Sequence, residues 1–491
     1  MTIERAEHYL KIQDFSSAEQ MYKRLLKENI NNIEAMWGLG KVALAQNSYQ
    51  RAYDLFVRCL HINAKIPDVY LSLAQACSAL TRFDKTEQAL LSAYQLSSHS
   101  IKVLYALSVY YCESGNLDKS EQFLNQILTI DQENIPAFSL LVRIKKIGAG
   151  SPFNPLITQY ENLLREGDLL VHDKVLLNYS FGDLFHLSKK YTQAFYHYKE
   201  ANRLQKQLIN FSVSDMKPSI DLLLKAFTSS VIQSFSNISP ASTVLTSHIN
   251  ITPIFIVGQP RSGSTLLEQM LIGHNDIVSA GEIPHIGDDL VNAITQVTSE
   301  GFPLGCQSLT KEQCLSLALH YLTKLKEISG GDHKFVIDKM PANYQFIGLI
   351  KLLLPQAKII HIKRDPRDVS WSIFKNNFGA LEPNFCSQTE IGQYHQLYQK
   401  VMLHWKSVLP KEVYDIEYED LVNSPENEIT QVLAYCGLAF EKDCLNFSSK
   451  KRVIKTLSDT QLRKGIQKRS IPDWTPYEHE LKAMFDLLDQ K

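Results

Sequence analysis

The stretch FIVGQPRSGSTLLEQML, residues 255–271, decides the fold of the second half of the chain. It opens with β-branched and aromatic residues, which are typical of a buried strand. STLLEQML then has the apolar spacing of a helix. A strand, a turn containing Gly263 and a helix form the context in which backbone N–H groups at a helix start bind an anion. We therefore expect an anion-binding loop at residues 258–265.

The glycines of this loop have the spacing of a P-loop, with one substitution. In Gly258-x-x-x-x-Gly263-Ser264-Thr265, Ser264 takes the place of the lysine that reaches the β- and γ-phosphates of a nucleoside triphosphate. The loop keeps its backbone donors but lacks that cation. Its anion is therefore expected to differ from a triphosphate held with magnesium.

Two further segments read as buried strands with cations at their ends. KFVID ends at Lys339, and AKIIHIKRD ends at Arg364. In a parallel α/β sheet, ligands gather at the carboxyl ends of the strands. We therefore predict an α/β domain with a parallel sheet over residues 251–491, in which Ser264, Thr265, Lys339 and Arg364 converge on one polyanion.

Four motifs in this half occur together, in the order PRSGSTLL, DKMPANYQFIGLI, IIHIKRDPRDVSWS and YEDLV. From about residue 252 to 477 the chain resembles the sulfotransferase family, and within it the tyrosylprotein sulfotransferases and their bacterial relatives fused to tetratricopeptide repeats. The resemblance implies a fold related to nucleotide kinases. It also implies the donor 3′-phosphoadenosine 5′-phosphosulfate and no metal.

The resemblance assigns roles around the transferred sulfuryl group. Lys339 would stabilise the leaving phosphate, and Glu282 would deprotonate the acceptor hydroxyl, with His285 as the alternative base. Arg261 would add a fixed cation beside the sulfuryl group. The 5′-phosphosulfate would lie in the loop, held by Arg261, Ser262, Gly263, Ser264 and Thr265.

The same resemblance assigns the rest of the donor. Arg364 and Ser372 would bind the 3′-phosphate. Arg367 would either join them or pair with Asp365 or Asp368, and the pairing is the expectation.

Tyr418 would lie against the adenine, and Ser458 belongs to a basic stretch that resembles the loop closing over the donor. The chain departs from the tyrosylprotein branch before the base, where Gly281 replaces a glutamate, and after it, where Pro284 replaces an arginine. These departures leave the acceptor open. The resemblance favours a protein or peptide, such as a protein tyrosine, but a carbohydrate, lipid or small-molecule hydroxyl also fits the catalytic groups.

The first half repeats with a period of 34 residues. Large residues recur at Phe15, Tyr49, Phe83 and Leu117, and a small residue follows each of them by three positions. The pattern predicts pairs of antiparallel helices and resembles the tetratricopeptide repeat. We expect a helical solenoid over residues 1–210, which by architectural analogy would bind a peptide or protein partner. Residues 211–250 would connect the domains, with a loop near 234–242.

The composition narrows the class of protein. The 491 residues are 44% hydrophobic and 21% charged, with a net charge of −1, which argues against a dedicated nucleic-acid or polybasic membrane binder. Neither a signal peptide nor a membrane span is expected. The eight cysteines contain no C-x-x-C pair, so zinc is unlikely and a reducing cytoplasm is the simplest compartment.

The sequence thus predicts a cytoplasmic sulfotransferase with a partner-binding repeat domain. Two alternatives stay open at this stage. One is a P-loop nucleotide kinase, although Ser264 disfavours it; the other is a repeat scaffold with a non-catalytic nucleotide-binding domain.

Overall fold

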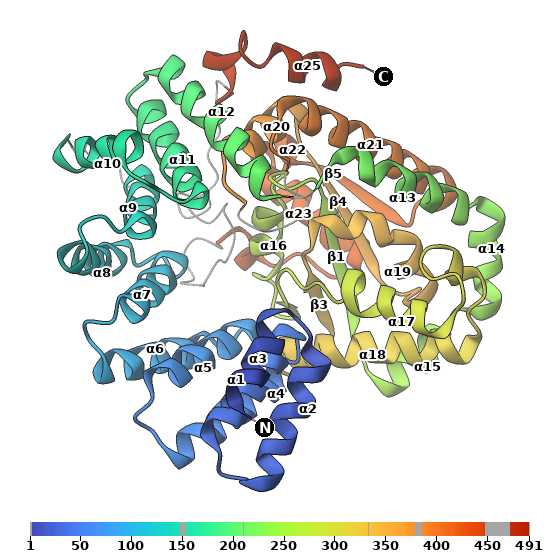
Figure 1. The fold of residues 1–491 in the computed structure, drawn as a ribbon. Coiled ribbons are helices and arrows are strands. Elements are labelled where there is room, and N and C mark those ends of the chain that lie inside the picture. Colours follow the sequence, from blue (N-terminus) through green and yellow to red (C-terminus); the bar gives the residue numbers. More distant parts are fainter. Residues whose placement is uncertain are drawn as a thin grey trace. The chain divides into compact units, whose positions relative to one another are not determined.

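The computed structural model describes residues 2–147, 154–209, 211–331, 333–378, 385–446 and 472–490 (Figure 1). The chain divides into two compact units. One is built on Met1–Leu141, and the other takes in Val142–Lys326 and most of the chain from Gly331 onward.

The first unit consists of helical hairpins in the predicted register. Each large residue of the 34-residue repeat begins the second helix of a hairpin, and the small residue three positions later is buried in every case. Its small size lets the two helices approach closely. The hairpins are α1 (Ile3–Lys11) with α2 (Phe15–Glu28), α3 (Ile33–Ala45) with α4 (Tyr49–Ile62), α5 (Pro67–Ala79) with α6 (Phe83–Leu96), and α7 (Ile101–Glu113) with α8 (Leu117–Ile130).

The turns inside these hairpins repeat as well. Two residues before each second helix the backbone has a positive φ, at Gln13, Asn47, Thr81 and Gly115. The residue that follows each positive-φ residue donates its N–H to a carbonyl five positions back, as Ser48 N does to Ala43 O at 2.8 Å. This hydrogen bond satisfies a carbonyl at the helix end and reverses the chain. The repeat is therefore present in the backbone as well as in the side chains.

The hairpin of α11 (Val171–Leu187) and α12 (Tyr191–Leu208) belongs to the second unit. Asn202 of α12 is buried and donates its Nδ2 to the Phe374 carbonyl at 2.7 Å. Tyr198 packs its ring edge-on against Trp371, with the centroids 5.6 Å apart. The hairpin thus supports the helix α20 (Pro366–Phe374). Two more helices precede it along the chain, α9 (Ile135–Ile147) and α10 (Asn154–Glu166).

The connecting segment is mostly helical. It forms α13 (Val213–Ala226), α14 (Ser229–Ile238) and α15 (Ser242–His248), so the loop expected at 234–242 is wrong except for residues 239–241. The Thr228 hydroxyl caps α14, and the buried Phe235 ring packs edge-on against Phe227. Burial of this apolar ring outweighs the serine-rich composition of the segment.

The second unit contains a five-stranded parallel sheet, counted over the described residues, in the order β2-β3-β1-β4-β5. The predicted strands are confirmed as β1, β3 and β4. The sequence analysis missed the short β2 and the partly exposed β5. The strands are β1 (Thr252–Gly258), β2 (Ile277–Ser279), β3 (Phe335–Asp338), β4 (Lys358–Lys363) and β5 (Val413–Glu417).

Helices cover both faces of this sheet, as right-handed crossovers require. On one face α16 (Ser264–Leu271) contacts β1 and α23 (Pro425–Cys436), which also contacts β4 and β5. From β3 the chain runs through η3 (Pro341–Phe346) and α19 (Ile347–Leu353) to β4. From β4 it runs through α20 and α21 (Gln388–Val408) to β5. The elements η3 and α21 contact each other. The remaining elements are α17 (Val291–Val297), α18 (Lys311–Ser329), α22 (Tyr418–Asn423), α25 (Lys482–Leu488), η1 (Ile286–Leu290), η2 (Leu304–Gln307), η4 (Lys442–Leu445) and η6 (Thr475–Tyr477).

The described residues contain no helix that combines the length and the apolar character that a membrane span requires.

Candidate functional site

We call the loop predicted to bind an anion, residues 258–265, the phosphate loop. It connects β1 to α16 and has a strained backbone. Gly263, at the N-cap of α16, has φ 102°, and Arg261 has φ 71°, which is unusual for a residue with a side chain. A Cβ at Gly263 would come within 2.3 Å of Tyr418 Cδ2. Ser264 and Thr265 follow as the first, buried residues of the helix. The loop therefore needs glycine at 263 because of both its φ and the nearby ring.

A cluster of cations lies at the end of β4, beside the loop. Arg261 Nε donates to Ser372 Oγ at 2.8 Å, and Arg364 Nη1 donates to the Arg261 carbonyl at 3.3 Å. The Arg364 guanidinium also lies over the Tyr418 ring, 4.5 Å from its centroid, and pairs with Asp368 at 3.0 Å. Four of the residues predicted for the donor thus come together from three separate segments.

Asp365 and Arg367 act differently from the expectation. The Asp365 side chain caps α20 by accepting from the backbone N–H of Arg367 at 2.8 Å. The Arg367 guanidinium pairs with Asp489 at 2.9 Å, so the expected pairing with Asp365 or Asp368 is wrong. The partner comes from a C-terminal segment that local sequence spacing cannot identify.

A second cluster lies at the ends of β2 and β3. The Lys339 side chain is 1% exposed, forms an ion pair with Glu282 Oε1 and lies 3.8 Å from Glu268 Oε2. Ser279 donates its hydroxyl to Glu268 Oε1. The backbone fixes the pair, because Lys339 N donates to the Gly281 carbonyl at 2.9 Å.

Burial opposes the charged form of both Lys339 and Glu268. For Lys339 the two glutamates outweigh burial, and its pKa lies above the ordinary value. Burial raises the pKa of Glu268, although Lys339 and the Ser279 hydroxyl oppose the shift. Lys339 is therefore held as a cation in a site largely removed from water, where charge acts strongly.

Glu268 was not among the residues predicted from the sequence. It lies one helical turn after Ser264 on α16, and this i, i+4 spacing was the available signal. Through it the phosphate-loop helix is tied to the end of β3.

The strand order places the two clusters on either side of the phosphate loop. β1 carries the loop in the middle, β3 with Lys339 pairs on one side of it, and β4 with Arg364 on the other. An extended anion could therefore contact the loop and a cation on each side. The predicted convergence at the carboxyl edge is a feature of the sheet topology.

His285 is buried close in sequence to Glu282. It is 1% exposed, its Nδ1 lies 2.6 Å from Asp289 Oδ2, and its Nε2 has no hydrogen-bond partner among the described residues. The ring is thus fixed by Asp289 on one side. Ser458, predicted to contact the donor, lies outside the described residues.

Asp473 forms ion pairs with side chains from two different parts of the second unit. It pairs with Lys375, which follows α20, and with His186 Nε2 of α11 at 3.3 Å. Burial opposes its negative charge, but the His186 and Lys375 contacts hold the pKa of Asp473 well below its usual range. The hairpin, α20 and the C-terminal segment are therefore linked beside the cationic cluster.

Comparison with known proteins shows which family the second half of the chain is similar to. Residues 253–442 match the model of the sulfotransferase family. This match confirms the resemblance seen in the four motifs.

Individual relatives cover different parts of the chain. An uncharacterized protein of Aquifex aeolicus (strain VF5) is 28% identical over 385 residues, 77% of this chain and 48% of that protein. A Caenorhabditis briggsae protein, named provisionally as a protein-tyrosine sulfotransferase, is 22% identical over 45% of this chain and 80% of its own length. An omega-hydroxy-beta-dihydromenaquinone-9 sulfotransferase of Mycobacterium tuberculosis (strain CDC 1551 / Oshkosh) is 32% identical over 21% of this chain and 29% of its own. The chain thus spans about half of the first relative and under a third of the last.

Proposed function

We propose that this protein transfers the sulfuryl group of 3′-phosphoadenosine 5′-phosphosulfate to a hydroxyl group, with Glu282, Lys339 and Arg261 as its catalytic residues. The observation that carries the proposal is the placement of cations on both sides of a phosphate loop that lacks the triphosphate lysine. Arg364 and Arg261 lie on one side and Lys339 on the other.

The donor fits the residues present. The backbone N–H groups of Ser262, Gly263, Ser264 and Thr265 at the start of α16 suit the 5′-phosphosulfate. The 3′-phosphate would bind Arg364 and Ser372, and Tyr418 would contact the adenine beside them. Ser458 would join the donor site from the C-terminal stretch.

Residues of this chain can supply the base and the cation that sulfuryl transfer needs. The acceptor oxygen attacks sulfur while the bond from sulfur to the bridging oxygen breaks, and Glu282 takes the proton of the acceptor hydroxyl. Negative charge develops on the bridging oxygen, which leaves as part of adenosine 3′,5′-bisphosphate. Lys339, charged and buried, stabilises that oxygen. His285 is the alternative proton acceptor.

The first test compares Glu282→Gln and Lys339→Met with the native chain. We expect each variant to lose at least ~100-fold in transfer of labelled sulfate to a tyrosine-containing acidic peptide, and to bind adenosine 3′,5′-bisphosphate within a few-fold of native affinity. Near-native turnover by either variant would remove the role assigned to that residue. Binding of magnesium ATP in preference to the bisphosphate would instead favour a kinase.

We also propose that residues 1–210 form the partner-binding domain, that 211–250 connect it to a sulfotransferase domain at 251–491, and that the protein acts in the cytoplasm. The half-buried Trp37, with Lys41 4.3 Å above its ring, supports recognition of a peptide through aromatic and charged contacts. With a protein acceptor, Trp37→Ala should raise KM and leave kcat unchanged. An unchanged KM for every protein acceptor would argue against this role and leave the transfer chemistry intact.

A further inference from the structure

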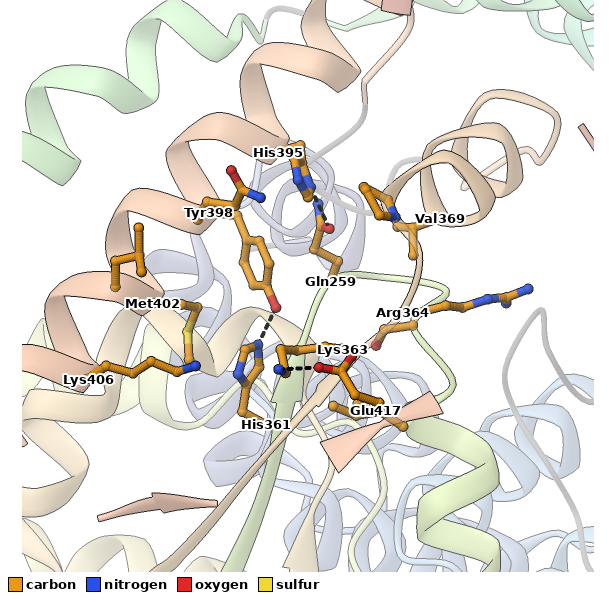
Figure 2. Close-up of a pocket in the computed structure, with 15 residues that line it drawn as sticks. Gln259, His361, Lys363, Arg364, Val369, His395, Tyr398, Met402, Lys406 and Glu417 are labelled. Atoms are coloured by element: carbon orange, nitrogen blue, oxygen red, sulfur yellow. Dashed lines mark hydrogen bonds and ion pairs between the residues drawn. The ribbon is translucent and has the colours of Figure 1, made fainter. Parts of the chain in front are cut away.

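A cavity of about 540 Å³ lies between β4 and α21, with Gln259 and Ser262 of the phosphate loop in its wall (Figure 2). Its size is within the range of sites for small organic molecules, ~300–1,000 Å³. Figure 2 shows the Arg364 side chain pointing away from His361, Tyr398 and Met402, which line this cavity. Arg364 and Ser262, both assigned to the donor site, form part of the cavity wall. The cavity therefore adjoins the donor site, while the Arg364 guanidinium points away from these three residues (Figure 2).

Two polar atoms in the cavity wall are buried without a partner. Ser262 is 1% exposed and His395 is 5% exposed. Neither Ser262 Oγ nor His395 Nε2 has a hydrogen-bond partner within the described ranges. Buried polar atoms without partners are rare, because each costs free energy, so a pair of them in one cavity points to a bound ligand or water.

The protonation of His395 defines what it can bind. Its Nδ1 lies 2.9 Å from the side-chain oxygen of Gln259, so Nδ1 carries the proton. Burial lowers the pKa of His395 to about 4. The ring is therefore neutral near pH 7, and Nε2 is a hydrogen-bond acceptor that requires a donor from the ligand.

The rest of the wall favours an apolar, uncharged body. Ile362, Val369 and Met402 are buried apolar residues of the lining. The lysines, the arginine and the glutamate of the lining are already paired: Lys363 with Glu417, Lys406 with Asp415, and Arg364 with Asp368. A charged ligand would have to compete with these ion pairs.

We propose that this cavity is a second ligand site, next to the donor site and sharing Ser262 and Arg364 with it, for an uncharged and largely apolar molecule that carries one hydroxyl group. The hydroxyl donates to His395 Nε2, Ser262 Oγ is the second polar group available to it, and the body of the ligand packs on the apolar wall.

The experiment measures binding of 2-naphthol and of 2-methoxynaphthalene, which lacks the donor, to the full chain near neutral pH by calorimetry. Native protein should prefer 2-naphthol. His395→Phe should remove that preference, weakening 2-naphthol by ~3–10-fold and leaving 2-methoxynaphthalene unchanged. Met402→Trp, which fills the cavity, should abolish binding of both, whereas Gln393→Trp, at an exposed position of the same helix, should not.

Saturating adenosine 3′,5′-bisphosphate should leave the affinity for 2-naphthol within twofold. Displacement by the bisphosphate would place the probe in the donor site, and binding unaffected by Met402→Trp would place it elsewhere; either result overturns the proposal. Failure of native protein to bind the probe, as expected for a cavity that holds only water, overturns it too. If circular dichroism shows that His395→Phe is unfolded, the Met402→Trp and displacement experiments still decide.

Discussion

Gly263→Ala tests the geometry of the phosphate loop most directly. The native φ of 102° disfavours any residue with a Cβ, at a cost of about 1–2 kcal/mol. The added methyl would also come within 2.3 Å of the Tyr418 ring, and forcing that ring to move adds about 1–3 kcal/mol. The expected loss in free energy of unfolding is therefore about 2–5 kcal/mol.

Gly437→Ala is the matched control. Gly437 also has a positive φ, 81°, but a Cβ there would meet no atom of the described structure within 4 Å. It should therefore show the backbone cost alone, about 1–2 kcal/mol. The difference between the two variants isolates the contact with Tyr418.

Urea unfolding followed by tryptophan fluorescence measures both losses, and calorimetry measures binding of adenosine 3′,5′-bisphosphate. Gly263→Ala should bind the bisphosphate at least ~10-fold more weakly, because Tyr418 also packs on Arg364. Gly437→Ala should bind it normally. The added substitution Tyr418→Ala should recover part of the stability lost in Gly263→Ala. Equal destabilisation of the two glycine variants would refute the steric argument.

Three further outcomes are expected. Asn202→Leu should cost about 1–3 kcal/mol of unfolding free energy, because the buried hydrogen bond to the Phe374 carbonyl is lost; an unchanged urea midpoint would contradict this. His395 has a folded-state pKa of about 4, so unfolding takes up a proton below about pH 6.5, and stability present above that pH is lost on acidification. Between neutral pH and about pH 5 this proton uptake lowers the free energy of unfolding by about 2 kcal/mol, and His395→Phe should lack that loss. Identical pH profiles for the two proteins would argue against the low pKa of His395. Ala52→Leu should cost about 1–3 kcal/mol by overpacking a buried helix crossing, whereas Arg51→Ala, at an exposed ion pair, should cost no more than about 1 kcal/mol in the same urea assay.

The local sequence predicted the elements that carry the site. Strand, glycine turn and helix are local patterns, so β1, the loop and α16 could be read from residues 252–271. Lys339 and Arg364 follow strands whose apolar runs are also local, and parallel topology places their ends at one edge. The 34-residue period likewise predicted where each second helix starts, because the large residue of every repeat stands at the same position in its own hairpin.

Local patterns failed where composition and burial disagree. The serine-rich residues 234–238 were expected in a loop but continue α14, because burial of Phe235 compensates for weak helix formers. The strand β5 was missed because most of its residues are only partly buried, which weakens the apolar signal.

The kind of each element, the repeat and the residues at the strand ends could thus be read from the amino-acid order. Which of these residues contact one another depends on the folded chain. Arg261 contacts Ser372 across 111 positions, and Asn202 contacts Phe374 across 172. Glu268 lies beside Lys339, and His395 lines the cavity between β4 and α21. The physical reason is that such contacts depend on how helices and strands distant in the chain pack together, whereas sequence spacing reports only on neighbours within one element.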